Sequence, residues 1–345
     1  MFKRDSFIKT IFVGSLLLAS ANLSAQETVT KSGTTAAAFL QIPIGGRTLA
    51  MGGASVAVAG DASSGYLNPG MLGELSQSQL YIMHSEYFAD VNLEYVGFVY
   101  PAPGLGTFSV NVISLNMGEM LITTVDDPEG LSGAQFDAGS FALAFGYGRS
   151  LTDKFAIGGT FKYVQEKIWN SSATGLAIDL GTIFTTPFDG VRLGVSISNF
   201  GTKMKISGDD LLVQHDIDPI HAGNNNSTNA LLTTESFDLP LNLRFGVAYD
   251  AMKSENSRLT IEVDGMHPNN NSESVSIGGE LALLKESFFL RGGYQNLFLE
   301  DNEASYTAGV GLKYNAGNML LRFDYAYADF QHLQGIHQIG FSLGF

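Results

Sequence analysis

The chain contains no cysteine and only one tryptophan among its 345 residues. Without cysteine it can form neither disulfides nor thiolate metal sites. Basic residues are also scarce, because 19 Lys and Arg stand against 34 Asp and Glu, for a formal net charge of −15. Nucleic-acid binding requires a basic surface that neutralises phosphates, so this balance argues against a nucleic-acid partner.

Long apolar runs are missing as well, apart from a short one near the N-terminus. Residues 1–25 combine the basic Lys3 and Arg4 with the apolar stretch 11–21 and end at Ala25. This is the pattern of a secretory signal peptide cleaved near Ala25. A helical anchor fits less well, because a spanning helix needs roughly 20 apolar residues. An exported chain without such a helix can enter a bilayer only as a closed barrel.

Most of the remaining chain alternates apolar and polar residues with period two, which indicates strands with one apolar face. In 318–329, for example, Leu321 and Phe323 fall on one face, and Arg322 and Asp324 fall on the other. Such runs predict fourteen strands, at 78–85, 91–101, 105–116, 138–150, 153–167, 173–186, 190–200, 237–250, 256–266, 273–284, 286–296, 303–314, 317–329 and 335–345.

The connections between these strands alternate between short and long. The tight turns include 102–104 and 151–152, whereas 117–137 and 201–236 are long and polar. Bacterial outer-membrane barrels have short periplasmic turns, longer extracellular loops and an even strand count. A soluble two-sheet β-protein would also alternate apolar and polar residues, but it would not explain this sequence of loop lengths.

The last strand, Ile336–Phe345, has one apolar face and ends on Phe345, which we expect to be the barrel-closing terminal residue. The sequence therefore predicts an all-β fold. Residues 78–345 would form a transmembrane antiparallel β-barrel of 14 strands in the bacterial outer membrane, in contact with its lipid and lipopolysaccharide.

The segment 26–77 differs, because it is rich in glycine and alanine and lacks the period-two pattern. We expect it to lie inside the barrel as an N-terminal plug, or hatch. Inward positions such as Gly181, Gly246 and Gly278 would leave room for its backbone.

Charged side chains also fall on the predicted inner face, and two interpretations of them stay open. They form either a polar conduit or ligand site, or compensating pairs that hold the plug, because unpaired charges in a dry lumen are costly. Their mixed signs argue against a selective ion pore. This set consists of Glu94, Lys162, Asp179, Arg192, Arg244, Glu262, Asp264, Glu280, Arg291, Lys313, Arg322 and Asp324.

No catalytic motif is present, since the chain has neither a His-Glu-x-x-His nor a Gly-x-Ser-x-Gly sequence. We therefore expect a protein that is not an enzyme and has no cofactor or metal. Acidic loop residues such as Asp127 and Asp210 could bind calcium, but they lack EF-hand spacing and are more simply solvated.

Several stretches of the N-terminal segment resemble a known signature. Phe39–Pro43, Gly46–Ala54, Gly60–Ser63 and Asn68-Pro69-Gly70 resemble the PorV/PorQ family within the FadL-like group of outer-membrane barrels. That family commonly has Asn-Pro-Ala where this chain has Gly70. The resemblance implies a fourteen-stranded barrel with a hatch.

The resemblance also implies one of two functions. One is a component of the type IX secretion system, which binds the translocon or exported cargo carrying a C-terminal signal domain. The alternative is a FadL-like passive transporter of hydrophobic small molecules. The transporter interpretation predicts an apolar pocket beside Asn68, Pro69 and Gly70.

Five residues of the segment are candidates for a gate: Arg47, Asp61, Asn68, Pro69 and Gly70. Asp61 and Asn68 would act either as hinges or as caps of helices and turns, which both residue types favour. Arg47 would either bind a carboxylate headgroup in a bidentate manner or pair with Asp61.

Overall fold

The structure, a computed structural model, describes residues 31–58, 60–221, 227–299 and 302–345. Within these ranges Ser32–Phe345 form one compact unit. The predicted signal peptide, residues 1–25, lies outside the described residues. None of the helices in the described ranges is long and apolar enough to cross a membrane.

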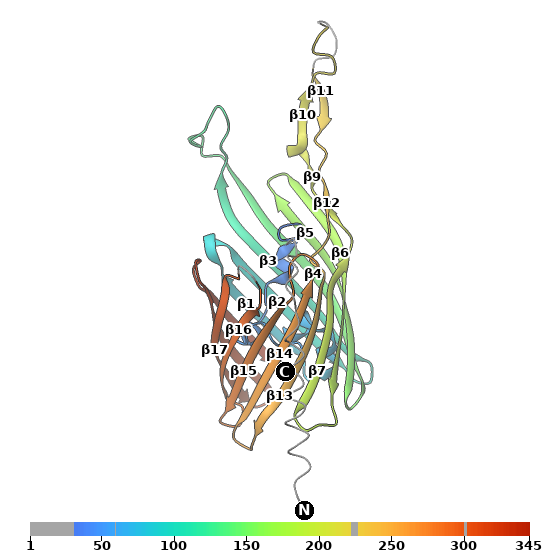
Figure 1. Cartoon of the computed structure of the whole chain (residues 1–345), viewed down its shortest axis with the longest axis vertical. Coiled ribbons are helices and arrows are strands. Elements are labelled where there is room, and N and C mark those ends of the chain that lie inside the picture. Colours follow the sequence, from blue (N-terminus) through green and yellow to red (C-terminus); the bar gives the residue numbers. More distant parts are fainter. Residues whose placement is uncertain (1–30, 59, 222–226, 300–301) are drawn as a thin grey trace, which may run out of the picture. The chain divides into compact units, whose positions relative to one another are not determined.

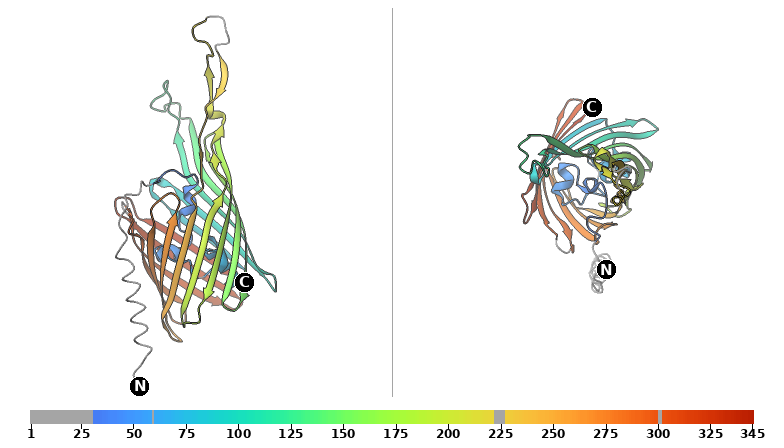
Figure 2. Two further views of the ribbon diagram at one scale, coloured as in Figure 1. Left: turned by 45° about the vertical axis from the view of Figure 1, so that its right-hand side comes forward. Right: turned by 90° about the horizontal axis from the view of Figure 1, so that it is seen from above.

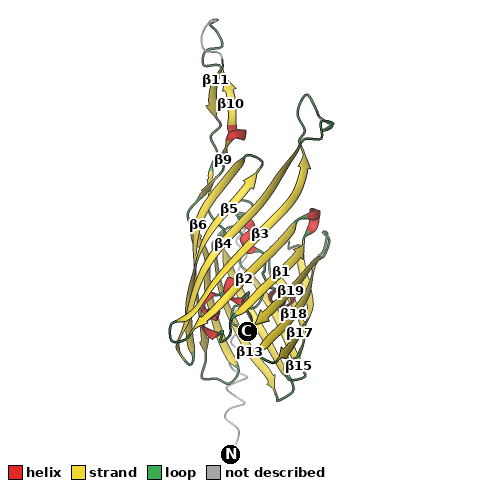
Figure 3. Ribbon diagram, turned by 180° about the vertical axis from the view of Figure 1, so that it is seen from behind, coloured by secondary structure: helices red, strands yellow, loops and turns green. Residues whose placement is uncertain are grey.

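A single antiparallel sheet of fourteen long strands, counted over the described residues, closes into a barrel (Figures 1 and 3). Its strands are β1 (Gln79–Glu86), β2 (Asn92–Ala102), β3 (Gly106–Leu121), β4 (Gln135–Thr152), β5 (Phe155–Ile168), β6 (Ser171–Thr185), β7 (Val191–Gly201), β13 (Asn242–Lys253), β14 (Arg258–Pro268), β15 (Ser274–Leu283), β16 (Phe288–Leu297), β17 (Ala304–Ala316), β18 (Met319–Phe330) and β19 (Ile336–Gly344). The predicted fourteen-stranded barrel is confirmed, and most of the predicted spans agree to within about three residues.

Closure occurs between the first and last strands. β1 pairs with β19 along its full length, with Tyr81 opposite Ser342. Beyond this pairing, the backbone N–H of Phe345 donates to the carbonyl of Ser78 at 3.0 Å. Its ring also stacks near that of Phe98, with 6.4 Å between centroids. No strand edge of the barrel therefore remains unpaired, as a bilayer requires.

The two faces of each strand differ in the way the alternation predicts. On β19, Ile339 and Phe341 are 45% and 44% exposed, whereas Gln338 and Ser342, which lie on the other face of the strand, are buried. The exposed apolar side chains form an outer belt around the barrel. This arrangement suits a wall that faces lipid outside and a packed interior inside.

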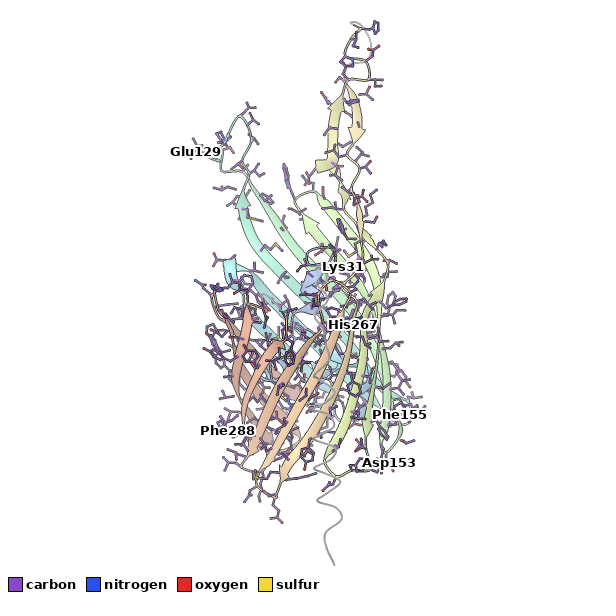
Figure 4. All side chains as sticks on the ribbon, in the orientation of Figure 1. Lys31, Glu129, Asp153, Phe155, His267 and Phe288 are labelled. Carbon is purple, nitrogen blue, oxygen red and sulfur yellow. The ribbon has the colours of Figure 1, made fainter. Side chains whose placement is uncertain are left out.

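Connections of different length separate the two ends of the barrel. Asp153, in the tight β4–β5 turn, lies at the short-turn end, and Glu129 lies in the long β3–β4 connection at the other end (Figure 4). β3 and β4 are the longest strands, at 16 and 18 residues. We call the end with the longer connections the extracellular end.

The longest connection, between β7 and β13, contains short elements of its own. Among them, β10 (Leu212–His215) and β11 (Thr228–Leu231) pair as a hairpin that rises beyond the other strands (Figure 1). The rest of this connection comprises β8 (Met204–Lys205), β9 (Ser207–Gly208), η5 (Asp209–Leu211) and β12 (Ser236–Phe237).

The described part of the N-terminal segment lies inside the ring of strands, as the view from above shows (Figure 2). Between residues 31 and 77, leaving out residue 59, it contains four short helical turns: η2 (Ala38–Gln41), α2 (Gly46–Ala50), α3 (Ser64–Leu67) and η3 (Pro69–Glu74). Nearly all residues from Ile44 to Leu72 that the structure describes are buried. We refer to residues 35–75 as the plug.

Apolar side chains of the plug pack against inward side chains of the first strands. Tyr66 of α3 meets Tyr95 of β2 edge to face with 6.2 Å between ring centroids, and Tyr81 meets Tyr95 at 6.0 Å. Elsewhere the backbones approach closely. A Cβ at Gly278 of β15 would lie 2.7 Å from the Cβ of Met51, so glycine is required there.

We expect Phe341→Arg to lower the free energy of unfolding by about 2–4 kcal/mol, because a charge on the lipid-facing belt must enter hydrocarbon. Urea unfolding in lipid vesicles measures this change. Val125→Arg is the matched control, since Val125 is 99% exposed in the β3–β4 connection. Equal stability of the two variants would contradict a lipid-facing position for Phe341.

Candidate functional site

The predicted charged set lies on the inner face of the barrel with one exception. Glu94 is wrongly predicted, because its side chain is 51% exposed on the outer face and contacts His84 Nδ1 at 2.6 Å. The inner positions of β2 are instead Leu93, Tyr95 and Val99. The inner face of β2 is apolar because it packs against the plug. The charge of Glu94 was therefore a misleading sign that its side chain points into the barrel.

Glu280 of β15 is the centre of the largest charge cluster. Its carboxylate accepts from Arg47 Nη2 at 2.8 Å, Arg291 Nε at 2.9 Å and Arg258 Nη2 at 3.1 Å. Arg291 also pairs with Asp324 of β18. Since Arg47 belongs to α2, this cluster joins the plug to the wall.

The pairing of Arg47 with Asp61 that the sequence permitted does not form, because Arg47 pairs with Glu280. Asp61 pairs with Arg322 of β18 at 3.3 Å instead, and Arg322 also donates to the carbonyl of Gly60 at 2.6 Å. Asp61 further accepts the backbone N–H of Ser63 at 2.9 Å, which stabilises the local turn.

Asn68 caps η3. Its side-chain oxygen accepts the backbone N–H of Gly70 at 3.0 Å, and its amide donates to the carbonyls of Val56 and Thr182 at 2.8 and 3.0 Å. A Cβ at Gly70 would lie 2.8 Å from the Cα of Thr182. This approach explains why glycine stands where the resembling family commonly has alanine.

Two buried carboxylates of β14 hold the plug backbone. Asp264 accepts the N–H groups of Ser55 and Val56 at 3.0 and 3.1 Å, and Glu262 accepts that of Ala57 at 2.5 Å. These oxygens replace the water that would otherwise hydrate the turn.

Other inner charges pair within the wall. Lys162 lies 2.6 Å from Asp179, and its ammonium lies 4.9 Å from the centre of the Tyr66 ring. Near the short-turn end, Arg192 pairs with Asp250 at 2.9 Å, and Lys313 lies 4.0 Å from Glu286. These contacts favour the interpretation of compensating pairs over that of a polar conduit.

The acidic loop residues make local hydrogen bonds. Asp127 accepts the N–H groups of Leu131 and Ser132 at 2.8 and 2.9 Å. The hydrogen bonds from Ser132 hold the pKa of the Asp127 carboxyl below its usual value. In the described part of the chain, no group of three or more His, Cys, Asp or Glu is placed to hold a metal ion.

An apolar pocket of about 380 Å³, which we call the rim pocket, lies at the extracellular end of β3–β6. Phe136 and Ile168 continue the inward positions of β4 and β5, and the Trp169 ring lies 6.4 Å from that of Phe136. The lining residues are Leu121, Ile122, Thr123, Phe136, Ile168, Trp169, Ser171, Ile206, Asp210 and Leu211.

The sequence did not predict this position. The transporter interpretation placed an apolar pocket beside Asn68, Pro69 and Gly70, but those residues are buried against β6, and none of them lines the rim pocket. The available signal was the apolar character of Phe136, Ile168 and Trp169 at strand ends, where loops are usually polar.

Asp210 fixes one side of the rim pocket. Its carboxylate accepts from the backbone N–H of Asn170 and the hydroxyl of Ser171, each at 2.9 Å. These bonds tie η5 to the β5–β6 turn and so hold Leu211 against the pocket.

Sequence comparison with known proteins matches only part of this chain. A protein-family model described as "Uncharacterised protein family (UPF0164)" matches residues 15–159, less than half of the chain. No curated protein matches the chain.

Similar solved structures include the CymD monoaromatic hydrocarbon channel, with a TM-score of 0.56, 11% identity, and 87% of this chain and 96% of that chain covered. The toluene transporters TbuX of Ralstonia pickettii and TodX of Pseudomonas putida each match with a TM-score of 0.53. Their identities are 12% and 13%, and each comparison covers 87% of this chain and 97% of the other. This chain therefore shares its barrel fold with hydrocarbon channels.

We expect Glu280→Gln to lower the free energy of unfolding by about 3–5 kcal/mol, because it leaves buried guanidinium groups without their shared carboxylate. Denaturant unfolding in detergent micelles measures the change. Glu273→Gln is the control, because its pair with His267 is exposed and such pairs contribute about 1 kcal/mol at most. A loss no larger than in the control would contradict a central role for Glu280.

Proposed function

We propose that this barrel passes hydrophobic small molecules across the bacterial outer membrane. The rim pocket is the observation that carries the proposal. It is lined mainly by aliphatic and aromatic side chains, and it lies at the end that would face the medium. A pocket of this size and lining suits a small apolar solute. The shared fold with hydrocarbon channels is consistent with this function.

Capture would be driven by removal of apolar surface from water. Phe136 and Trp169 offer ring faces, and Ile168 and Leu211 complete an apolar surface between β4, β5 and η5. Since Asp210 is committed to Asn170 and Ser171, its charge is satisfied without a ligand. The pocket therefore favours uncharged solutes.

Below the rim, the plug occupies the interior and is bound to the wall by the Glu280 cluster and by Asp264. A solute that crosses this region must displace part of the plug or leave sideways through the wall. The contacts at Glu280, Asp61 and Asp264 would hold the plug while no solute passes.

A second function is favoured by a different observation, the β10–β11 hairpin. Leu212 and Leu231 are register partners on this hairpin and are 48% and 65% exposed, beyond the barrel. Exposed apolar groups on a projecting ribbon suit the docking of a protein. This would be the role of a type IX secretion component of PorV/PorQ type, which binds a translocon or the signal domain of its cargo.

We expect the double variant Phe136→Ser, Trp169→Ser to slow toluene entry into proteoliposomes at least tenfold, because each substitution removes roughly 1.5–3 kcal/mol of apolar contact. Entry is measured with radiolabelled toluene. Phe188→Ser serves as control, since Phe188 is 74% exposed at the short-turn end. Unchanged entry in the double variant would remove the basis for the transport proposal.

The secretion alternative predicts that partner binding, and not toluene entry, depends on the β10–β11 hairpin. Leu212→Ser combined with Leu231→Ser should abolish co-purification of a translocon or signal-domain cargo in mild detergent, and toluene entry should remain unchanged. The control is Leu105→Ser, since Leu105 is 63% exposed in a short turn at the other end. If the unmodified protein purifies without either partner, the secretion alternative is wrong.

A further inference from the structure

A second pocket, of about 140 Å³, opens beside β13–β16 at the extracellular end of the barrel interior. Its lining is polar, whereas that of the rim pocket is apolar, because amide and hydroxyl side chains predominate in it. We call it the amide pocket. It is lined by Gln41, Asn242, Arg244, Met266, Pro268, Asn270, Asn271, Ser272, Ser274, Asn296 and Leu299.

Arg244 is the charged side chain of this lining, and it is only 8% exposed. Within the described ranges its guanidinium makes no hydrogen bond or ion pair. Each of the other inner arginines forms an ion pair with a carboxylate. These are Arg47, Arg192, Arg258, Arg291 and Arg322. None of the Arg244 nitrogens is among the fully buried polar atoms without a partner, so the guanidinium donors open onto the pocket. A bound anion would supply the acceptors that these donors lack.

The acidic group that interacts with Arg244 electrostatically, Asp264, does not supply these acceptors. Asp264 accepts the backbone N–H groups of Ser55 and Val56 with one oxygen, and its other oxygen is buried without a hydrogen-bond partner. Neither oxygen makes a hydrogen bond with Arg244, so the two side chains interact only through their charges. Removing Asp264 from these N–H groups would release the plug turn. Asp264 therefore offsets part of the Arg244 charge without occupying its N–H groups, and these donors remain available to the amide pocket.

The neighbouring polar groups are suited to share an anion with Arg244. The side-chain oxygen of Asn242 is buried and has no hydrogen-bond partner. Rotating the amide by 180° would present its NH₂ group to the pocket. Asn271, at the exposed side of the pocket, accepts the backbone N–H of Ser272 at 2.9 Å through its side-chain oxygen, and its NH₂ group is a donor that can reach a bound group from outside.

We propose that the amide pocket binds a compact, hydrophilic oxyanion, a carboxylate or a phosphate, that arrives from the extracellular side. Arg244 donates two parallel hydrogen bonds to it, the geometry that guanidinium offers to both groups. The pocket holds about the volume of four or five waters, which fits a small anion and excludes a long acyl chain. This site goes beyond hydrocarbon passage, because an uncharged solute has no use for Arg244.

The test uses the full-length protein in uncharged detergent, titrated with inorganic phosphate and with acetate at constant ionic strength set by chloride. Calorimetry should show saturable binding of both, each displacing the other. Arg244→Gln should weaken binding at least tenfold, the effect of losing a charge-assisted hydrogen bond in a buried site. Arg149→Gln, at the exposed short-turn end, is the matched control and should bind as the unmodified protein does.

A second variant keeps the test valid if Arg244→Gln fails to fold. Asn271→Asp places a negative charge at the exposed side of the pocket and should weaken both anions at least tenfold by repulsion. Binding that is equal in the unmodified protein and in both pocket variants would overturn the proposal.

Titration with laurate distinguishes a free small anion from the headgroup of an amphiphile. The proposal expects laurate to bind no more tightly than acetate. Laurate binding at least tenfold tighter than acetate, and lost in Arg244→Gln, would overturn the compact-anion assignment. Toluene entry should be unchanged in Arg244→Gln, so failure of the transport proposal and failure of this one are separate results.

Discussion

A bilayer provides no hydrogen-bond partners for an exposed strand edge, and this constraint organises the whole molecule. β1 must therefore meet β19, which brings the two ends of the barrel sequence together in one register. Closure creates an inner surface as well as an outer one. The outer surface is covered by lipid, but the inner surface needs protein to cover it, and the plug supplies that protein.

Filling the interior explains the charges there. The plug is short and has few regular hydrogen bonds of its own, so many of its backbone groups need partners from the wall. Asp264 and Glu262 accept from three successive residues of the plug, and Asn68 bridges the plug to β6. Most of the inner charged side chains are tolerated because they form ion pairs, and Glu262 and Asp264 are stabilised by backbone N–H groups instead.

The barrel is not uniform around its circumference. β3 and β4 extend furthest, and with η5 they form the apolar rim pocket. The shorter β13–β16 side carries the polar amide pocket around Arg244. Two pockets of opposite chemical character therefore open at the same end of the barrel. An apolar solute and a small anion would not compete for one site.

Local pattern was sufficient to determine the strands, because alternation of side chains is a property of neighbouring residues. It predicted the number of strands and the alternation of short and long connections. Partner choice depends on residues far apart, such as Arg47 and Glu280, and only closure of the barrel sets their distance. The outward direction of Glu94 also depends on distant residues, because the plug packs against the apolar inner face of β2. The two pockets likewise exist only where separate strands and loops converge, so they belong to the tertiary structure alone.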